Sequence, residues 1–138
     1  MAFRRRPAVS RHVRLGAVVV IAVALFVASV VPSQAVPQGE SVAGLSVFAL
    51  FHVISYATLA VVLAYSAVDV ARSPRLLLLA VFVGTVSYGA AIEGVQSLLS
   101  YRFFSVRDIG LNALGATLGI GIWWLLDSWT NWSQAGES

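Results

Sequence analysis

YRFFSVRDIGLNALGATLG, residues 101–119, passes from a polar loop into a glycine-rich apolar run. Two arginines, an aspartate and an asparagine lie at this border: Arg102, Arg107, Asp108 and Asn112. Charged side chains are costly inside a bilayer, so those near its edge usually face other helices or the head groups rather than the lipid tails. The stretch therefore predicts a membrane helix whose polar end packs against neighbouring helices.

The same stretch contains a stripe of polar and small residues. Asp108, Asn112, Gly115 and Gly119 are spaced i, i+4, i+7 and i+11, which places them on one face of a helix. Gly115 and Gly119 form a GxxxG pattern, which allows two membrane helices to approach closely. Because glycine is common in membrane helices, the pattern favours a packing role for these two glycines over a role in a functional site. A close neighbouring helix would hold Asp108 and Asn112 inside the protein.

The composition indicates an integral membrane protein. Of the 138 residues, 59% are hydrophobic and 11% are charged, whereas soluble domains average roughly 45–50% and about 25%. Cysteine is absent, which excludes disulfides, thiolate chemistry and cysteine-ligated metals. The net charge of +3 lies mainly in N-terminal arginines ahead of an apolar run. We interpret it as a topology signal and predict no nucleic-acid partner.

Four apolar runs have the length of a membrane helix, which needs roughly 17–25 residues. They are residues 15–31, 43–68, 76–99 and 109–126. The connections between them are short, so the sequence predicts an all-α fold, a four-helix transmembrane bundle. We assign three segments: a basic cytoplasmic N-terminal segment (1–14), the membrane domain (15–126) and a polar cytoplasmic tail (127–138).

The arginines predict the orientation of the bundle. With the N-terminus inside, seven of the nine arginines lie in the cytoplasm, and only Arg102 and Arg107 lie outside. This distribution agrees with the positive-inside rule. Tryptophans near the end of the fourth run suit the inner membrane interface. Both termini are therefore predicted to be cytoplasmic.

The first run has an alternative interpretation as a secretory signal peptide. A basic segment precedes it, and Ser33-Gln34-Ala35 supplies small residues at the spacing of a cleavage site. The run is longer than the roughly 7–15 apolar residues of a typical signal peptide, which favours an uncleaved helix. In either case residue 43 begins outside, and the rest of the topology is unchanged.

With both termini in the cytoplasm, the polar residues of the apolar runs lie in one layer near the outer side of the membrane. His52 and Tyr56 are spaced i and i+4 in the second run, and Glu93 and Gln96 lie near the end of the third. Glu93 is the most informative, because a carboxylate costs about 2.5–3.5 kcal/mol at the bilayer centre and usually marks a functional or paired site. His52 and Arg102 are its candidate partners.

Motifs of common chemistries are absent from the sequence, which has no GxSxG, no P-loop and no dinucleotide-binding fingerprint. His52, Glu93 and Asp108 are residue types that bind metals, but they come from three helices without a local pattern such as HExxH. We therefore predict no metal site and no cofactor. Whether the protein is an enzyme stays open.

The polar residues follow one another in a recognisable order: His52-x-x-x-Tyr56, Glu93-x-x-Gln96 and Arg102-x-x-Ser105-x-x-Asp108-x-x-x-Asn112-x-x-Gly115. This series, over about residues 30–120, resembles the VanZ-like membrane proteins. The resemblance implies a polar cluster that faces one side of the membrane, and it implies neither a reaction nor antibiotic resistance. Members usually have an Asp-Lys pair just before the histidine, where this chain has Phe48 and Ala49. A lysine contact to an anion is thus lost here or supplied by another basic residue.

Two functions remain open. In the first, an outward-facing site in the cell membrane, surrounded by membrane lipid, binds an anionic or lipid-linked component of the cell envelope. His52 and Glu93 would then be the catalytic, proton-exchanging pair. The substrate-binding residues would be Tyr56, Gln96, Arg102, Ser105, Arg107, Asp108 and Asn112. In the second, the polar residues form a structural network, and the protein is a non-catalytic accessory that contacts a membrane-protein partner.

Overall fold

The structure is a computed structural model that describes residues 9–32, 41–42, 45–69 and 73–135. Four helices contain most of these residues: α1 (Arg11–Val30), α2 (Val47–Ala67), α3 (Pro74–Gln96) and α4 (Val106–Ala135). All four are long and apolar enough to cross a membrane. The predicted all-α fold with four membrane helices is therefore confirmed. The signal-peptide cleavage site considered at residues 33–35 lies outside the described residues.

The helix ends differ from those expected from hydropathy alone. A two-residue antiparallel ladder, β1 (Ser41–Val42) with β2 (Leu45–Ser46), precedes α2. The helix therefore begins at Val47 and not at residue 43, where the apolar run begins. At its far end, α4 continues to Ala135, beyond the apolar run that the sequence predicts to end at residue 126. A helix needs only its backbone hydrogen bonds, which polar residues also allow. The first part of the predicted polar tail is therefore helical.

Serine caps set the start of three helices. The hydroxyl oxygen of each accepts a hydrogen bond from the backbone N–H three residues later, at 3.1, 3.1 and 3.2 Å, for Ser46, Ser73 and Ser105. Each bond satisfies a donor that has no partner within the helix, and such a cap contributes about 1 kcal/mol. Pro74 follows the second cap, where its missing N–H costs nothing.

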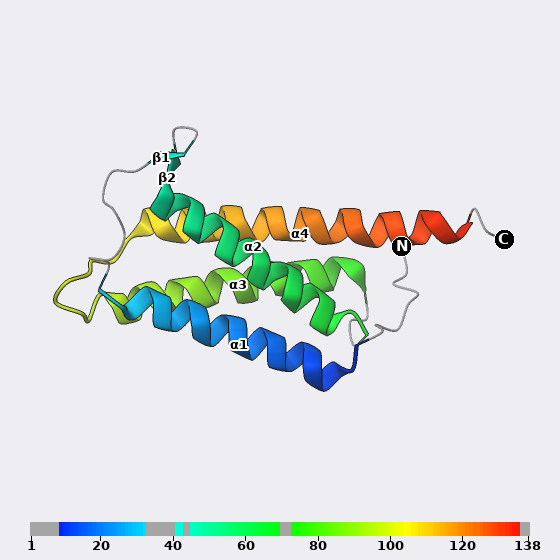
Figure 1. Ribbon diagram of the computed structural model, residues 1–138, viewed down its shortest axis with the longest axis horizontal. Helices are drawn as coiled ribbons and strands as arrows, with labels where there is room; N and C mark the ends of the chain where they lie inside the picture. The colour runs from blue at the N-terminus through cyan, green and yellow to red at the C-terminus, as the bar shows by residue number, and fades with distance from the viewer. Residues whose placement is uncertain (1–8, 33–40, 43–44, 70–72, 136–138) are drawn as a thin grey trace.

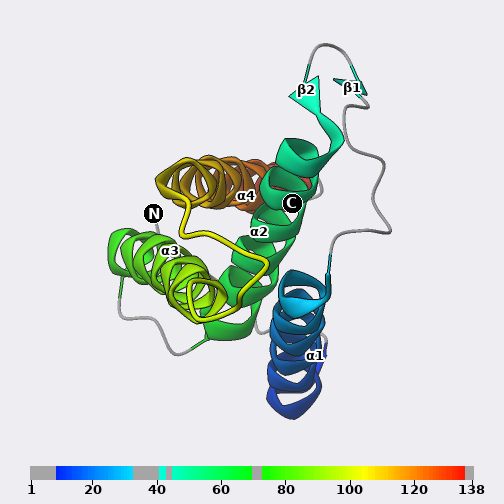
Figure 2. The ribbon, with the colours of Figure 1, turned by 90° about the vertical axis from the view of Figure 1, so that its left-hand side faces the viewer.

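α2 lies at the centre of the bundle and contacts each of the other three helices. Figure 2 shows α2, α3 and α4 as a group with α1 at its edge. The ends of α1 and α3 lie at the same end of the bundle as the starts of α2 and α4 (Figure 1). We call this end, which also holds β1, β2 and residues 97–105, the hairpin end. The opposite end, where α1 begins, is the Arg14 end.

Two glycines allow α2 and α4 to pack closely. A Cβ atom at Gly115 would lie 2.5 Å from the carbonyl oxygen of Val53, and one at Gly119 would overlap the carbonyl oxygen of Ala57. Both oxygens belong to the backbone of α2, so they cannot move without the helix. The GxxxG pattern therefore serves the packing of α4 on α2, as the sequence predicts.

Small and aliphatic side chains fill the centre of the bundle, and large apolar ones cover its outside. The central residues are Ala60, Ala64, Leu77, Val81 and Ala116. In α1, by contrast, Arg14 is the one buried residue, and the large apolar side chains of this helix face outward. Such an outer surface suits lipid. Helices in lipid associate through close packing and hydrogen bonds, because the surrounding tails are as apolar as the side chains.

Hydrogen bonds from α3 and the loop after it hold α1 in place. Tyr88, Gln96 and Tyr101 donate from their side chains to backbone oxygens of α1 at 2.5, 2.8 and 2.6 Å. The last two acceptors belong to Ser29 and Val30, at the end of α1. Carbonyl groups there have no partner within the helix. Leaving them unpaired inside a membrane would be costly, so these bonds stabilise the end of α1.

Arg14 fastens the start of α1 to the end of α2. Its side chain is 3% exposed and forms a two-point pair with Asp69, at 2.7 and 3.3 Å. It also donates to the backbone oxygen of Tyr65 at 2.6 Å, and the hydroxyl of Ser66 donates to the backbone oxygen of Arg14 at 3.1 Å. The hydrogen bond from Arg14 lowers the pKa of Asp69. The positive-inside rule placed Arg14 in the basic cytoplasmic N-terminal segment, and no pattern in the sequence indicates this contact with α2.

We expect Asp69→Asn to lower the melting temperature of the purified protein in detergent at neutral pH. The pKa of Asp69 lies below its ordinary value of 3.8. Its stabilising contribution is therefore complete above that value and is lost as the pH falls through the lowered pKa of the folded state. Melting curves at pH 7 and at pH 3 should show the gap between wild type and variant shrinking below about pH 4. A gap that stays constant would contradict the importance of this ion pair.

Gly119→Ala should destabilise the bundle by about 1–3 kcal/mol, because the added methyl group overpacks the contact with α2. Gly121→Ala is the matched control, since no atom lies within 4 Å of a Cβ atom at that position. Alanine also favours a helix over glycine by about 1 kcal/mol. Thermal unfolding of both variants in the same detergent measures the difference. Equal melting temperatures would refute the close packing of α4 on α2.

Candidate functional site

Three helices bring a histidine and two carboxylates together at the hairpin end. His52 comes from α2, Glu93 from α3 and Asp108 from α4, and one side-chain atom of each lies within 4.8 Å of the other two. His52 and Asp108 are half-buried, whereas Glu93 is 2% exposed. We call these three residues the polar cluster. Residues that the sequence expected in one layer of the bundle are thus close neighbours.

A hydrogen bond from the loop before α4 positions the Glu93 carboxylate. The backbone N–H of Ser105 donates to Glu93 Oε2 at 3.0 Å. The hydroxyl of the same serine accepts from the backbone N–H of Asp108 at 3.2 Å. Ser105 was predicted to bind substrate, whereas in this structure both groups are used within the protein. Its position links the carboxylate on α3 to the first turn of α4.

The hydrogen bond of His52 indicates its tautomer. Nδ1 lies 3.0 Å from the backbone oxygen of Phe48. A carbonyl oxygen only accepts, so we assign the proton to Nδ1, and Nε2 of the neutral ring keeps a free lone pair. The ring also lies between two aromatic side chains, with centroids 4.6 Å from Phe48 and 6.5 Å from Tyr56. These contacts hold the imidazole in one orientation.

Arg102 lies beside the polar cluster without forming a salt bridge to it. One terminal nitrogen donates to the backbone oxygen of Val31 at 3.3 Å, and the guanidinium carbon lies 5.8 Å from the centroid of the Phe48 ring. The Nε atom is buried and has no hydrogen-bond partner. The sequence named Arg102 as a candidate partner of Glu93. Among the described residues, however, no ion pair joins them, because the hydrogen bond to Val31 draws Arg102 towards α1.

A pocket of about 210 Å³ lies between α1, α2 and α3 at the hairpin end. Its polar wall contains Ser55 and five of the predicted site residues: His52, Tyr56, Glu93, Gln96 and Arg102. Its remaining wall is apolar and includes Leu25, Phe48, Phe51 and Ile92. Pockets for drug-sized ligands span roughly 300–1,000 Å³. This one therefore fits a small polar group with part of an apolar chain.

Asn112 forms the floor below the polar cluster. Its side chain is 1% exposed, and neither of its two polar atoms has a hydrogen-bond partner. Gly89 makes room for it, since a Cβ atom at that position would lie 2.5 Å from Asn112 Nδ2 and 2.8 Å from the Tyr56 ring. An unsatisfied buried amide costs about 1–3 kcal/mol. Such a group in the interior requires an explanation beyond packing.

The remaining predicted residues divide into two groups. Tyr56 and Gln96 are buried and line the pocket, and the Gln96 amide also donates to Ser29 of α1. Arg107 is exposed and does not line the pocket. It forms no hydrogen bond or ion pair within the described part of the chain. The structure therefore brings Tyr56 and Gln96 to the site and leaves Arg107 outside it.

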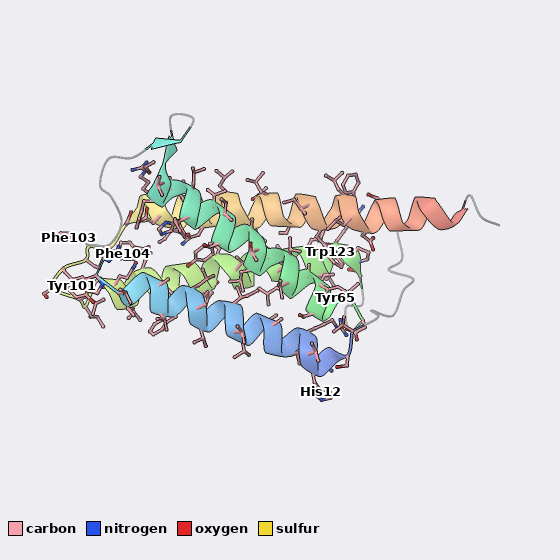
Figure 3. All side chains as sticks on the ribbon, in the orientation of Figure 1. His12, Tyr65, Tyr101, Phe103, Phe104 and Trp123 are labelled. Atoms are coloured by element: carbon pink, nitrogen blue, oxygen red, sulfur yellow. The ribbon has the colours of Figure 1, made fainter. Side chains whose placement is uncertain are left out.

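Aromatic side chains mark both ends of the bundle. Figure 3 shows Tyr101, Phe103 and Phe104 at the hairpin end, where Phe103 is 88% exposed. At the Arg14 end, the rings of Tyr65 and Trp123 lie 6.0 Å apart. Aromatic residues are enriched at the two membrane interfaces. Their run in residues 101–104 is a signal of the interface that was visible in the sequence but not used there.

The comparisons with known proteins give one match. The family model described as VanZ/LLP1 matches residues 11–127, which is most of the 138 residues. No curated protein and no solved structure matches the chain. The match covers all four apolar spans except the last residue of the fourth, so it includes the polar cluster and the pocket.

Gly89→Ala should disturb the site, because its methyl group would displace Asn112 and the Tyr56 ring. We expect a destabilisation of about 1–3 kcal/mol, as for other overpacked positions. Gly94→Ala on the same helix is the control, since no atom lies within 4 Å of a Cβ atom there. Thermal unfolding in one detergent compares the two variants. If Gly89→Ala melts no lower than Gly94→Ala, the tight floor described here is wrong.

Proposed function

The chain belongs to the VanZ/LLP1 family, and we propose that it binds the anionic group of a lipid-linked or phosphate-bearing component of the cell envelope. The protein is an integral membrane protein with four apolar spans. In this proposal it resides in the cell membrane, and the pocket at the hairpin end is the binding site. The observation that carries the proposal is a half-buried arginine, Arg102, whose buried Nε atom has no hydrogen-bond partner and whose side chain lines a largely apolar pocket.

Arg102 supplies the anion-binding group. A guanidinium has five N–H donors, and in this chain one terminal nitrogen is used by Val31 while Nε is buried without a partner. Phosphate and carboxylate groups accept two parallel hydrogen bonds from such a fork. Stacking on Phe48 limits the rotation of the group. Arg102 is therefore preorganised for an anion that enters the pocket.

The apolar wall supports an amphiphilic ligand. Leu25 and Ile92 line the pocket, and Phe51 does so while most of its side chain is exposed on the outer surface of α2. An acyl or isoprenoid chain could follow this wall towards the surrounding lipid, with its anionic group at Arg102. A free phosphate would use only the polar wall. The amphiphilic lining thus favours a lipid-linked ligand.

The distribution of arginines favours an outward-facing pocket. Arg11, Arg14 and Arg75 lie at the Arg14 end of the described chain, and Arg102 and Arg107 lie at the hairpin end. Four further arginines, at positions 4, 5, 6 and 72, precede α1 or lie between α2 and α3. The positive-inside rule then places the Arg14 end in the cytoplasm. We accordingly propose that the pocket is reached from outside the cell.

In the metal-free protein, His52 and Glu93 are proposed to act on the bound group. Both line the pocket. The free lone pair at His52 Nε2 can accept a proton, and the Glu93 carboxylate can accept one as well. A proton-exchanging pair of this kind would suit a bound phosphate or its ester. Tyr56 and Gln96 would orient the ligand from the same wall.

An accessory role is the second candidate function. It is favoured by the bonds that the same residues make within the protein, since Gln96 joins α3 to α1 and Glu93 joins α3 to the loop before α4. Interhelical hydrogen bonds in membranes contribute about 0.6–2 kcal/mol each. In this alternative the polar layer holds the bundle together, and the protein acts through a membrane-protein partner. The pocket and the unpaired Nε of Arg102 favour the binding function instead.

Arg102→Gln should weaken the binding of an anionic lipid about 10- to 100-fold, because hydrogen bonds to charged groups contribute about 1.5–3 kcal/mol. Phosphatidylglycerol in mixed detergent micelles is the probe, with phosphatidylcholine as the uncharged comparison. Native mass spectrometry counts the bound lipids.

Arg75→Gln is the matched control for Arg102→Gln, since it removes the same charge at the exposed start of α3. We expect this control to bind phosphatidylglycerol as the wild type does. Equal binding by wild type and Arg102→Gln would contradict the proposed function.

A further inference from the structure

We propose that His52, Glu93 and Asp108 bind one divalent transition-metal ion, with Asn112 as the floor of the site. This goes beyond the proposed function, because the cation site follows from the polar cluster alone. The three residues belong to three different helices and offer one ligand atom each within 4.8 Å of the others. One imidazole and two carboxylates form a set of ligands that zinc or manganese accepts.

The spacing of the polar cluster leaves room for an ion. Ligand atoms about 2.1 Å from a shared metal lie at most about 4.2 Å apart. The observed limit of 4.8 Å is slightly larger, and rotation of the Glu93 and Asp108 side chains would close the difference. No ion pair joins His52 to either carboxylate among the described residues. The three groups are thus near one another without being bonded to one another.

Hydrogen bonds within the protein already orient two of the proposed ligands. His52 Nδ1 bonds to the backbone oxygen of Phe48, which leaves Nε2 for a metal. Glu93 Oε2 accepts from the backbone N–H of Ser105. Histidines that bind metals almost always donate their other N–H to a carbonyl or carboxylate, and ligating carboxylates are hydrogen-bonded in turn. The surroundings of the polar cluster therefore have the form expected of a metal site.

No salt bridge among the described residues offsets the charge of the polar cluster, although Arg102 lies nearby. Glu93 and Asp108 lie within 4.8 Å of each other, and neither forms a salt bridge with a described arginine. Two carboxylates this close repel each other unless a proton or a cation lies between them. A divalent ion would offset both charges at once.

The buried side-chain amide of Asn112 is an independent observation that indicates a ligand. It is four residues after Asp108, and its neighbours Tyr56 and Gly89 are each four residues from His52 and Glu93. Its amide therefore lies one helical turn below all three ligands. Both polar atoms of this buried side chain lack a partner. A helical turn is about 5.4 Å, so the amide suits a further contact to the ion through a bound water.

A cation in this position would change what the pocket can bind. Without it, the two carboxylates of the polar cluster outnumber the one nearby guanidinium of Arg102, and an incoming anion meets a net negative site. With it, the ion and Arg102 present two positive partners across the same pocket, and the ion keeps an open position for an anionic oxygen. This consequence rests on the proposed function, whereas the cation site itself does not.

The test uses the full chain in detergent, treated with EDTA, desalted and titrated with Mn²⁺ by calorimetry, with Zn²⁺ as competitor. We expect one Mn²⁺ per chain, displaced by Zn²⁺. Asp108→Asn and Glu93→Gln should weaken binding at least tenfold, since loss of even an outer partner costs about 10–100-fold. Asp69→Asn removes the same charge at the Arg14 end and should leave Mn²⁺ binding unchanged. No binding to wild type, or equal binding to Asp108→Asn, would overturn the inference.

A second measurement does not depend on variants that fold. Electron spin echo modulation of the Mn²⁺-loaded wild type should show a coordinated imidazole nitrogen, and its absence would overturn the assignment to His52. Phosphatidylglycerol binding is then measured with and without Mn²⁺. Lipid binding that requires Arg102 in a protein that binds no metal leaves the proposed function standing and refutes the cation site. A bound metal without lipid binding supports the cation site and refutes the proposed function.

Discussion

The hydrogen bond from the Ser105 backbone N–H to the Glu93 carboxylate connects most features of the hairpin end. A carboxylate buried at membrane depth must find its partners within the protein or near the interface. Ser105 provides one such partner and caps α4 at the same time. The cap fixes the first turn of α4, so that Asp108 lies next to Glu93 and Asn112 lies one turn below. One loop residue thereby couples the end of α3 to the start of α4 and assembles the polar cluster.

In the middle of the bundle, by contrast, the helices associate through close packing and not through polar contacts. Gly115 and Gly119 place α4 against the backbone of α2, and small residues fill the centre beside them. This contact keeps His52 and Asp108 on facing helices at a fixed distance. The peripheral helix α1 depends instead on hydrogen bonds, from Arg14 at one end and from Gln96 and Tyr101 at the other. A pocket lined by α1, α2 and α3 therefore has one wall that is held mainly by polar contacts.

The sequence predicted the features that depend on local patterns and missed those that depend on contacts between helices. Four spans follow from hydropathy, and the shared layer of His52, Glu93 and Asp108 follows from helical spacing and orientation. The family resemblance is confirmed by the VanZ/LLP1 match. The Arg14–Asp69 pair, the use of Ser105 as a cap and the exclusion of Arg107 from the pocket depend on which side chains meet in space. The end of α4 was missed because hydropathy marks the membrane boundary and not the end of hydrogen bonding along the backbone.

The central claim is that the charges of Glu93 and Arg102 serve a ligand and not the stability of the fold. The melting temperatures of wild type, Glu93→Gln and Arg102→Gln, measured in one detergent with EDTA and without added lipid, test it most directly. Glutamine keeps an acceptor for the Ser105 N–H and removes the repulsion with Asp108. Functional sites often reduce stability, so neutralising their charges often leaves it equal or higher. Equal or higher melting temperatures for both variants are the predicted result, and a large fall in both would show that the polar layer holds the bundle together.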